Sequence, residues 1–203
     1  MKIIIPARKG SKGVPLKNRK LFKYTANIIP NEMKHFTYVV TDDENVKQMA
    51  MDKGFNVLDR THEVSSDKAS TKDLMKYTID RLGLLDETIL MLYLTYPLRK
   101  WEDVQKAICY FNVSSSKSLL CKHPLDVSPF LILKEEKDNK GSQLFNHDLY
   151  RRQDYPECFE LSHYISMFNS NEINNLNNNL YNNSTYFLPI KKKVIDVEPL
   201  EDK

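Results

Sequence analysis

The hydrophobic pattern along the first part of the chain alternates between short apolar runs and longer amphipathic stretches. The apolar runs predict strands at Ile3–Ile5, Thr37–Thr41, Asn56–Leu58, Thr88–Leu94 and Ser118–Cys121. Apolar residues on one helical face predict helices over Glu44–Lys53, from Ser70 to Leu82 and over Trp101–Phe111. Because strands alternate with helices, we expect parallel pairing through right-handed crossovers, and therefore an open α/β sheet.

Local signals mark where two of these helices begin and end. Asp43 is a candidate N-cap for the first helix, and Gly54 is a candidate C-terminal stop. Ser70 and Asp73 have the spacing of a capping box, and Gly83 directly follows the last apolar residue of the second helix.

The pattern changes after Pro124. Residues 129–134, PFLILK, predict a strand, and Tyr164–Phe168 predicts a strand that returns to the main sheet. We interpret the region at about 124–168 as an arm inserted into a single domain that spans residues 1–203. The Asn-rich segment 169–184 is interpreted as a loose surface connection, since asparagine is a weak helix former. Strands at Thr185–Leu188 and Lys193–Val197 are expected to close the sheet.

Composition is that of an ordinary globular chain. The 203 residues are 41% hydrophobic and 28% charged, and the net charge of +3 is too small to favour a nucleic-acid partner. No apolar run reaches the length of a membrane span, so no membrane partner is expected. The three cysteines lack CxxC spacing and the five histidines form no ligand pattern, which favours reduced thiols in the cytoplasm.

The stretch from Ile3 to Lys20 joins a predicted strand to a cationic loop. Pro6 ends the apolar run, and no acidic residue precedes Glu32. The loop contains two of the five glycines and a set of basic residues: Arg8, Lys9, Lys12, Lys17, Arg19 and Lys20. Backbone N–H groups, close approach at glycine and positive charge suit a polyphosphate site. A solvated basic loop or a nucleic-acid patch remains an alternative, since Walker A and GxGxxG patterns are absent.

Segments along nearly the whole chain resemble, in the same order, the cytidylyltransferases that activate sialic acids and related nonulosonic acids as CMP-sugars. The matching segments are IIPARKGSKGVPLKN at 4–18, VVTDD at 39–43, DRTHEVSSDKAST at 59–71, LTYPLR at 94–99, RRQDYP at 151–156 and IDVEPLED at 195–202. The resemblance implies a Rossmann-like nucleotidyltransferase fold of the glycosyltransferase-A-like type. This α/β fold has a mixed, mainly parallel sheet flanked by helices, with a small dimerisation arm. The resemblance also implies a homodimer that uses CTP, a nonulosonic acid and Mg²⁺.

The implied reaction is attack of the sugar's anomeric hydroxyl on the α-phosphorus of CTP, with loss of pyrophosphate. Such a step requires charge neutralisation and in-line placement. Arg8 and Lys17 match the family's triphosphate contacts, and Lys12 would add positive charge. The remaining cations of the loop, Lys9, Arg19 and Lys20, are interpreted as solvated.

The family's cytidine pocket is matched by Ala7, Arg8 and Asn18 on one side and by Arg60 and Thr71 on the other. Taken without the resemblance, Arg60 is a surface cation of a loop and Thr71 is part of a helix cap.

Asp196 and Glu198 occupy the family's metal-binding Asp-x-Asp positions, with glutamate in place of the second aspartate. Alternate residues of a strand point to the same side, so the two carboxylates could share one Mg²⁺. The alternative is an acidic tail. Arg151 and Arg152 lie in the segment that crosses to the partner subunit in the family, where guanidinium groups suit a sugar carboxylate. The alternative is an ordinary surface pair.

Three departures from the family pattern concern the substrate and the fold. Tyr93, assigned to the sugar site, replaces the usual glutamine, and residues 162–166 read SHYIS where NGAIY is common. The segment Leu21–Pro30 is shorter than usual, so we expect its helix to be clipped or replaced by a turn. Two alternatives therefore stay open: a non-catalytic relative that binds nucleotide or pairs with an active subunit, and a nucleotidyltransferase for Kdo or another sugar acid.

Overall fold

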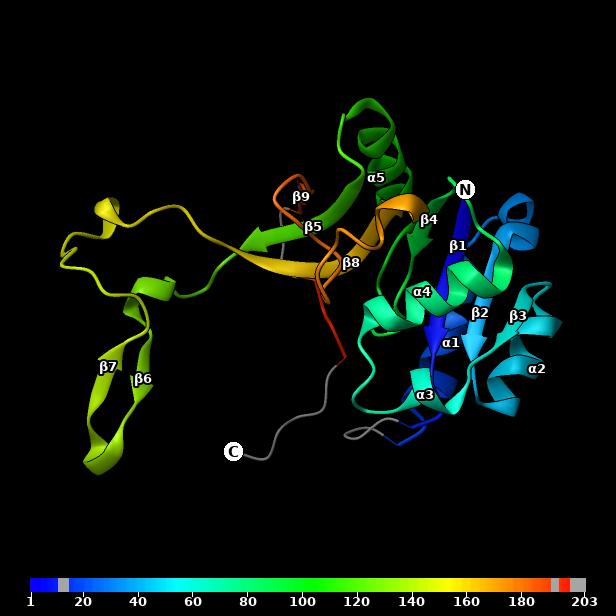
Figure 1. Cartoon of the computed structure of the whole chain (residues 1–203), viewed down its shortest axis with the longest axis horizontal. Coiled ribbons are helices and arrows are strands. Elements are labelled where there is room, and N and C mark those ends of the chain that lie inside the picture. Colours follow the sequence, from blue (N-terminus) through cyan, green and yellow to red (C-terminus); the bar gives the residue numbers. More distant parts are fainter. Residues whose placement is uncertain (11–14, 191–193, 198–203) are drawn as a thin grey trace.

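The computed structural model describes residues 1–10, 15–190 and 194–197, and it contains an α/β body from which one long arm projects (Figure 1). Seven strands of these described residues form the main sheet, in the order β3-β2-β1-β4-β8-β5-β9. The strands are β1 Lys2–Ala7, β2 Thr37–Thr41, β3 Asn56–Asp59, β4 Thr88–Met91, β5 Ser118–Pro124, β8 Phe159–Asn169 and β9 Tyr186–Pro189. Strand β8 is antiparallel to β4 and β5, while the other pairs are parallel, so the sheet is mixed and mainly parallel.

Helices connect the parallel strands and cover both faces of the sheet. They are α1 Lys17–Ile28, α2 Glu44–Asp52, α3 His62–Ser65, α4 Thr71–Leu82 and α5 Trp101–Val113. Short 3₁₀ turns lie at Asn31–Phe36, Pro129–Leu131, Lys137–Asn139, Arg152–Asp154 and Ser170–Glu172. Within the described ranges, no helix combines the length and the apolar character needed to cross a membrane.

Successive residues of β1 pack on opposite faces of the sheet, as the alternation of side chains along a strand requires. Ile3 and Ile5 belong to the core cluster that includes buried residues of α1, α2 and α5. Ile4 belongs to the other cluster, which is built on Leu74 and Met75 of α4. Because both faces of β1 are covered, the residues that follow it are held firmly at the edge of the core.

The expected cap signals are confirmed. The Asp43 side chain accepts from the backbone N–H of Asn45 at the start of α2. Ser70 and Asp73 form both bonds of a capping box at the start of α4. Gly83 ends α4 with φ 61°, a left-handed conformation that glycine adopts without steric cost.

The expectation of a clipped helix after the cationic loop is wrong. Helix α1 runs for 12 residues, and Phe22 and Ala26 are buried on one stripe with Ile29 just beyond it. This apolar spacing of four and three residues is sufficient to hold a helix against the sheet.

Two of the predicted strands are shorter than expected, and one is absent from the residues described. Strand β4 ends at Met91. Its parallel pairing with β1 joins Lys2–Ile4 of β1 to Ile89–Met91 of β4 and does not continue further. The PFLILK segment begins with a 3₁₀ turn, and only its last residues enter β6, Leu133–Glu135. Val194–Val197 form no strand, although a strand was expected over Lys193–Val197; Lys193 lies outside the described residues.

The Asn-rich segment is not the loose connection that its composition suggested. Ile173, Leu176 and Leu180 are buried in the same cluster as Leu74 and Met75 of α4. The ammonium group of Lys72 donates to the carbonyl oxygens of Asn174, at 3.0 Å, and Leu176. Three apolar side chains among many asparagines are therefore enough to fasten this segment beside the first turns of α4.

The arm leaves the main sheet after β5 and returns at β8 (Figure 1). It contains a two-stranded antiparallel sheet of β6 and β7, Gly141–Gln143, whose six residues are all exposed. Several large apolar side chains of the arm are also exposed, among them Leu131, Leu133, Leu144, Phe145 and Tyr150. The arm thus has little core of its own in the single chain.

Candidate active site

A cavity of about 290 Å³ lies where β1 and β4 end, between the first turns of α1 and α4. Ligand sites of open α/β sheets form at this edge, beyond the carboxyl ends of the strands. Six of the residues predicted to bind substrates line this cavity: Arg8, Lys17, Asn18, Arg60, Thr71 and Tyr93. Ala7 is fully buried at the end of β1, directly before Arg8.

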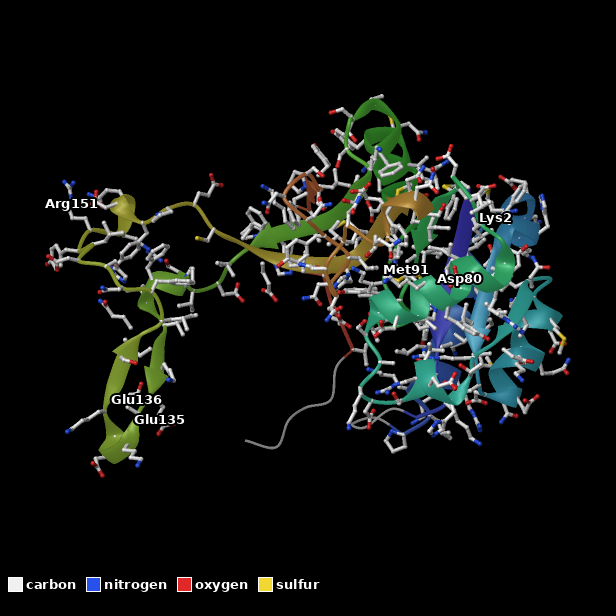
Figure 2. All side chains as sticks on the ribbon, viewed as in Figure 1. Lys2, Asp80, Met91, Glu135, Glu136 and Arg151 are labelled. Atoms are coloured by element: carbon white, nitrogen blue, oxygen red, sulfur yellow. The ribbon has the colours of Figure 1, made fainter. Side chains whose placement is uncertain are left out.

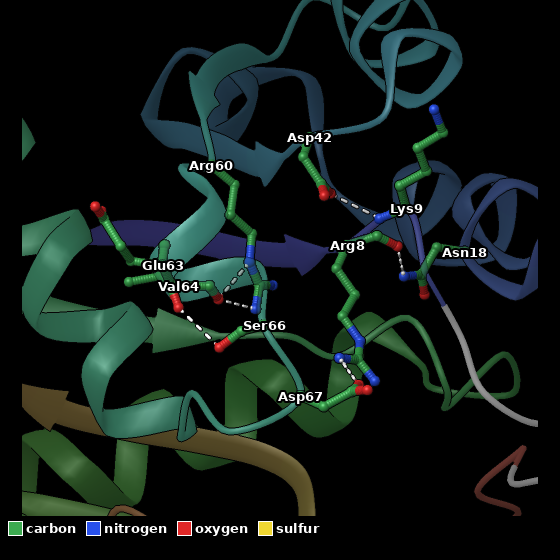
Figure 3. Close-up of polar contacts among 9 residues, drawn as sticks. All are labelled: Arg8, Lys9, Asn18, Asp42, Arg60, Glu63, Val64, Ser66 and Asp67. Atoms are coloured by element: carbon green, nitrogen blue, oxygen red, sulfur yellow. Dashed lines mark hydrogen bonds and ion pairs between the residues drawn. The ribbon is translucent and has the colours of Figure 1, made fainter.

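The loop after β1 is held in place by side chains from two other segments. Asn18 Nδ2 donates to the carbonyl oxygen of Arg8 at 2.8 Å, and Asp42 Oδ1 accepts from the backbone N–H of Lys9 at 2.7 Å (Figure 3). Asp42 comes directly after β2, the strand beside β1. The backbone of this loop is therefore positioned by polar contacts on both sides, which orients Arg8 toward the cavity.

Lys17 is the first residue of α1. The first turn of this helix contains no acidic residue, and its N-cap residue makes no side-chain cap bond. Leu16, directly before Lys17, has φ 57°, so the chain turns sharply into the helix. The N–H groups of a first helical turn and the positive end of the helix dipole favour an anion here. Arg19, predicted to be solvated, instead pairs with buried Asp43 at 2.8 Å, while Lys20 is exposed as expected.

Arg60 and Thr71 form part of the opposite wall. Arg60 Nε donates to the carbonyl oxygen of Val64 at 2.8 Å, and its Nη2 donates to the same oxygen (Figure 3). Burial lowers the pKa of Arg60, and nearby Arg8 lowers it further, whereas Asp42 opposes both effects. Thr71 is the first residue of α4, positioned by the capping box.

Tyr93 lies in the wall of this cavity beside Thr71. Its hydroxyl group is hydrogen-bonded to Thr71 Oγ1 at 2.6 Å, and burial raises the pKa of Tyr93. Behind it, the ring of His163 packs edge-to-face at 5.6 Å between centroids. Burial lowers the pKa of His163, and the charge of Asp196 opposes this shift. Tyr93 therefore connects the α4 side of the cavity with the polar residues of β8.

The C-terminal segment passes along the edge of the same cavity. The backbone N–H of Val197 donates to Thr95 O at 2.8 Å, and Lys17 Nζ donates to Val197 O at 3.1 Å. Exposed Asp196 is close enough for its charge to affect the pKa values of Tyr93, Tyr96 and His163. Lys17, at the end of the cationic loop, and Asp196, the described residue of the acidic pair, thus lie at one site.

Two predicted site residues that the structure describes, Arg151 and Arg152, lie away from this cavity, and two others cannot be placed. Lys12 and Glu198 fall outside the described residues. Arg151 lies on the arm, far from the body in Figure 2, and pairs with Asp154 at 2.9 Å. Arg152 lines a separate groove of about 1080 Å³ at the base of the arm. A single chain therefore does not bring Arg151 and Arg152 to the cavity.

The sequence alone predicts no role for Asp67 and Arg99, although both lie in segments that resemble the family's motifs. Asp67 lines the cavity and pairs with Arg8 at 2.8 Å (Figure 3). Arg99 is buried, and it donates to Tyr164 O at 2.7 Å and to Tyr93 O at 2.8 Å. Its charge also lies 5.5 Å from the ring centroids of Tyr96 and Tyr164. Nothing local distinguishes these two residues from surface charges, because their partners are distant in the sequence.

Among solved structures, the chain is similar to a CMP:2-keto-3-deoxy-manno-octonic acid synthetase complexed with CTP. The identity is 14%, the TM-score is 0.63, and 96% of this chain and 92% of that chain are covered. A 4-diphosphocytidyl-2C-methyl-D-erythritol synthase from Anaerococcus prevotii has 14% identity and a TM-score of 0.58, with 99% and 91% coverage. These likenesses show the expected α/β nucleotidyltransferase fold.

Curated relatives include the N-acylneuraminate cytidylyltransferases of Streptococcus agalactiae serotype V and Escherichia coli O18:K1:H7. The first is 29% identical over 161 residues and the second 30% over 165 residues, covering 74% and 71% of this chain. The chain spans 39% of the length of each relative. A family model described as Cytidylyltransferase matches residues 2–147. Because that match covers well over half of the sequence, the chain belongs to the cytidylyltransferase family.

Proposed function

We propose that this chain carries the active site of a cytidylyltransferase that transfers CMP from CTP to a sialic-acid-like nonulosonic acid. The observation that supports this most is that Arg8, Lys17 and Arg60, from three separate segments, line one cavity with Asn18 and Thr71. The names of the curated relatives suggest the same class of acceptor.

In the proposed reaction, the anomeric hydroxyl oxygen of the acceptor forms a bond to the α-phosphorus of CTP. The bond from that phosphorus to the oxygen that bridges to the β-phosphorus breaks, and pyrophosphate leaves with the electron pair. The hydroxyl proton passes to solvent. Arg8 and Lys17 would neutralise the charge on the phosphates, and the N–H groups at the start of α1 would bind their oxygens.

The exposed carboxylate of Asp196 beside the cavity supports an Mg²⁺ site, because proteins usually hold this ion through one or two carboxylates together with substrate phosphates. Asp196 is exposed and adjoins Val197, which contacts Lys17. In the described part of the chain, no three His, Cys, Asp or Glu residues cluster closely enough to hold a metal ion by themselves. We propose that Asp196 and Glu198 hold Mg²⁺, which would supply further neutralisation of phosphate charge. Lys17 would orient this segment through the Val197 carbonyl.

The acceptor site is proposed to include Tyr93 and, from a second copy of the chain, Arg151 and Arg152. Support comes from the exposed apolar residues of the arm, which a homodimer would cover, and from the distance of Arg151 from the body in a single chain (Figure 2). Guanidinium groups would bind the sugar carboxylate with two parallel hydrogen bonds.

A cytoplasmic location is proposed from the thiols. Cys109, Cys121 and Cys158 are free. Cys121 lies in the core, where burial raises its pKa to about 12, so this thiol is unreactive at neutral pH. Unpaired thiols are typical of a reducing compartment.

The test is a turnover assay of the purified protein with CTP and Mg²⁺ against a panel of sialic, legionaminic, pseudaminic and Kdo-type acids. Release of pyrophosphate with at least one nonulosonic acid is expected, and turnover of Kdo alone would favour the Kdo-type alternative. CTP binding without any turnover would support the non-catalytic relative and contradict the catalytic proposal.

Lys17→Met and Lys20→Met form a matched pair for this assay, because both remove a lysine from the first turns of α1. Loss of a charged contact to phosphate costs about 1.5–3 kcal/mol, so kcat/KM of Lys17→Met should fall about 10- to 100-fold. Lys20 is exposed, and its variant should retain activity. Equal losses in both variants would argue against a specific role for Lys17.

A further inference from the structure

The cations of the cavity all have acceptors within the protein itself. Lys17 donates to the carbonyl oxygen of Val197 and Arg60 to that of Val64. Arg8 differs, because its Nη1 atom lies 2.8 Å from a carboxylate oxygen of Asp67. Among these three contacts between described residues, Lys17 and Arg60 donate to neutral carbonyl oxygens, whereas Arg8 donates to the charged carboxylate of Asp67. A carboxylate thus lies inside a cavity whose other charged lining residues are cationic.

Arg8 and Asp67 come from opposite walls of the cavity. Arg8 directly follows β1, whereas Asp67 lies between α3 and α4, 59 residues later. In Figure 3 the Arg8 side chain extends toward Asp67, while Arg60 turns toward Val64. The Arg8 and Asp67 side chains retain 31% and 50% exposure, so solvent screens their attraction. An exposed pair of this kind is weak enough for a polyphosphate to displace.

The same carboxylate has opposite effects on the empty and the filled cavity. Without a ligand, its charge balances that of the Arg8 guanidinium group 2.8 Å away. In the filled cavity its charge repels the phosphates and competes with them for the Arg8 guanidinium.

We propose that Asp67 is an internal competitor for Arg8, which holds the guanidinium group in the unliganded protein and lowers the affinity of the cavity for polyphosphate. This inference rests on the proposed function only in taking a polyphosphate as the ligand. It adds to the binding site an acidic residue that tunes affinity, where the charge pattern of the loop indicated cations alone.

The test compares three variants by calorimetry at low ionic strength, with inorganic tripolyphosphate as the probe and EDTA present. EDTA removes metal ions, so the substitution of Asp67 cannot change the affinity by removing a ligand of a bound metal. Asp67→Asn keeps the shape and removes the charge, and it should bind tripolyphosphate about fivefold more tightly than the wild type. Asp67→Glu, which keeps the charge, should show a smaller change.

Asp80→Asn is the matched control, because it removes one exposed carboxylate near the far end of α4. It should leave the affinity unchanged. An equal gain in Asp80→Asn would reduce the effect to net charge and overturn the proposal. Unchanged or weaker binding by Asp67→Asn would overturn it too, since weaker binding means that Asp67 orients Arg8 for the ligand. Absence of tripolyphosphate binding in all variants would have the same consequence.

Thermal unfolding without ligand gives an independent readout. Without ligand, Asp67→Asn should unfold at the same or a slightly lower temperature, because its pair with Arg8 is lost. The expected gain in affinity is therefore not accompanied by a gain in stability. Turnover with CTP is measured separately. If Asp67→Asn binds tripolyphosphate more tightly but the wild-type protein does not turn over CTP, this inference is preserved and the proposed function is contradicted. If the wild-type protein turns over CTP but Asp67→Asn binds tripolyphosphate with unchanged affinity, the proposed function is supported and this inference is overturned.

Discussion

Lys17 Nζ donates a hydrogen bond to the carbonyl oxygen of Val197, 3.1 Å away and 180 residues later in the chain. The contact joins the start of α1 to the segment that carries Asp196. Since Val197 also donates its N–H to Thr95 at 2.8 Å, the segment is attached to the cavity edge at two points. Lys17 and Asp196, which are proposed to bind phosphate and metal, are thereby held at the same edge of the cavity.

We expect Lys17→Met to loosen this attachment. A hydrogen bond to a charged group contributes about 1.5–3 kcal/mol, so hydrogen exchange at the Val197 amide should accelerate about tenfold or more. Amide exchange followed by NMR measures this, with Lys20→Met as the control. Equal exchange rates in the two variants would mean that the Thr95 contact alone orders the segment.

Arg99→Met should destabilise the fold. Burial lowers the pKa of Arg99 to about 10, and its guanidinium group donates to the carbonyl oxygens of Tyr164 and Tyr93. Leaving one buried and one partly buried carbonyl without these donors should lower the free energy of unfolding by about 2–4 kcal/mol. Urea denaturation measures the change.

The control for Arg99 is Arg81→Met on the exposed side of α4, which should stay within about 0.5 kcal/mol of the wild type. A neutral Arg99→Met variant would show that apolar packing replaces the buried cation without loss, as happens for some buried ion pairs.

The stability of the protein should fall as pH is lowered below about 6.5, the ordinary pKa of histidine. Burial lowers the pKa of His163 in the folded state, despite the opposing charge of Asp196. Below that pH the unfolded chain binds a proton that the folded chain resists, so unfolding becomes more favourable until the folded pKa is reached. Urea denaturation across pH 5–7.5 follows the effect.

His163→Gln should flatten this pH dependence, whereas His35→Gln, which removes an exposed histidine, should not. Retention of the full slope in His163→Gln would assign the effect to another group.

Leu176→Ala should cost about 2–5 kcal/mol of unfolding free energy, as expected for truncation of a buried leucine. Leu176 is 2% exposed in the cluster that includes α4. Asn178→Ala, at an exposed position of the same segment, should be nearly neutral in the same denaturation experiment. A neutral Leu176→Ala would restore the interpretation of the segment as a loose connection.

Mixing two variants of reduced activity should restore part of the lost activity if the arm serves the partner's cavity. A Lys17→Met chain keeps its arm and an Arg151→Met chain keeps its cavity, so a mixed dimer has one complete site. The turnover assay after co-refolding measures this, and sedimentation velocity gives the oligomeric state. No recovery in a mixture that does form dimers would mean that Arg151 acts on its own chain or not at all.

The body of the sheet and the caps were predictable because their signals are local. Apolar runs mark β1 and β2, and Asp43, Ser70 and Gly83 mark helix ends within a few residues of the groups they contact. The full length of helix α1 differs from the expectation, which rested on Leu21–Pro30 being shorter than the matching segment of the family. The apolar stripe of Phe22 and Ala26 within the segment is what determines the helix. The Asn-rich segment was misjudged from composition, although three apolar residues decide its packing.

The sequence by itself determined the strand–helix order, the cationic loop after β1 and the motifs of a cytidylyltransferase, since these follow from neighbouring residues. Only the tertiary structure decided that β8 enters between β4 and β5, that Tyr93 pairs with Thr71, and that Asp67 pairs with Arg8. These contacts join residues far apart in the chain, and no local periodicity records them. They form because packing on the two faces of one sheet brings the strand ends together.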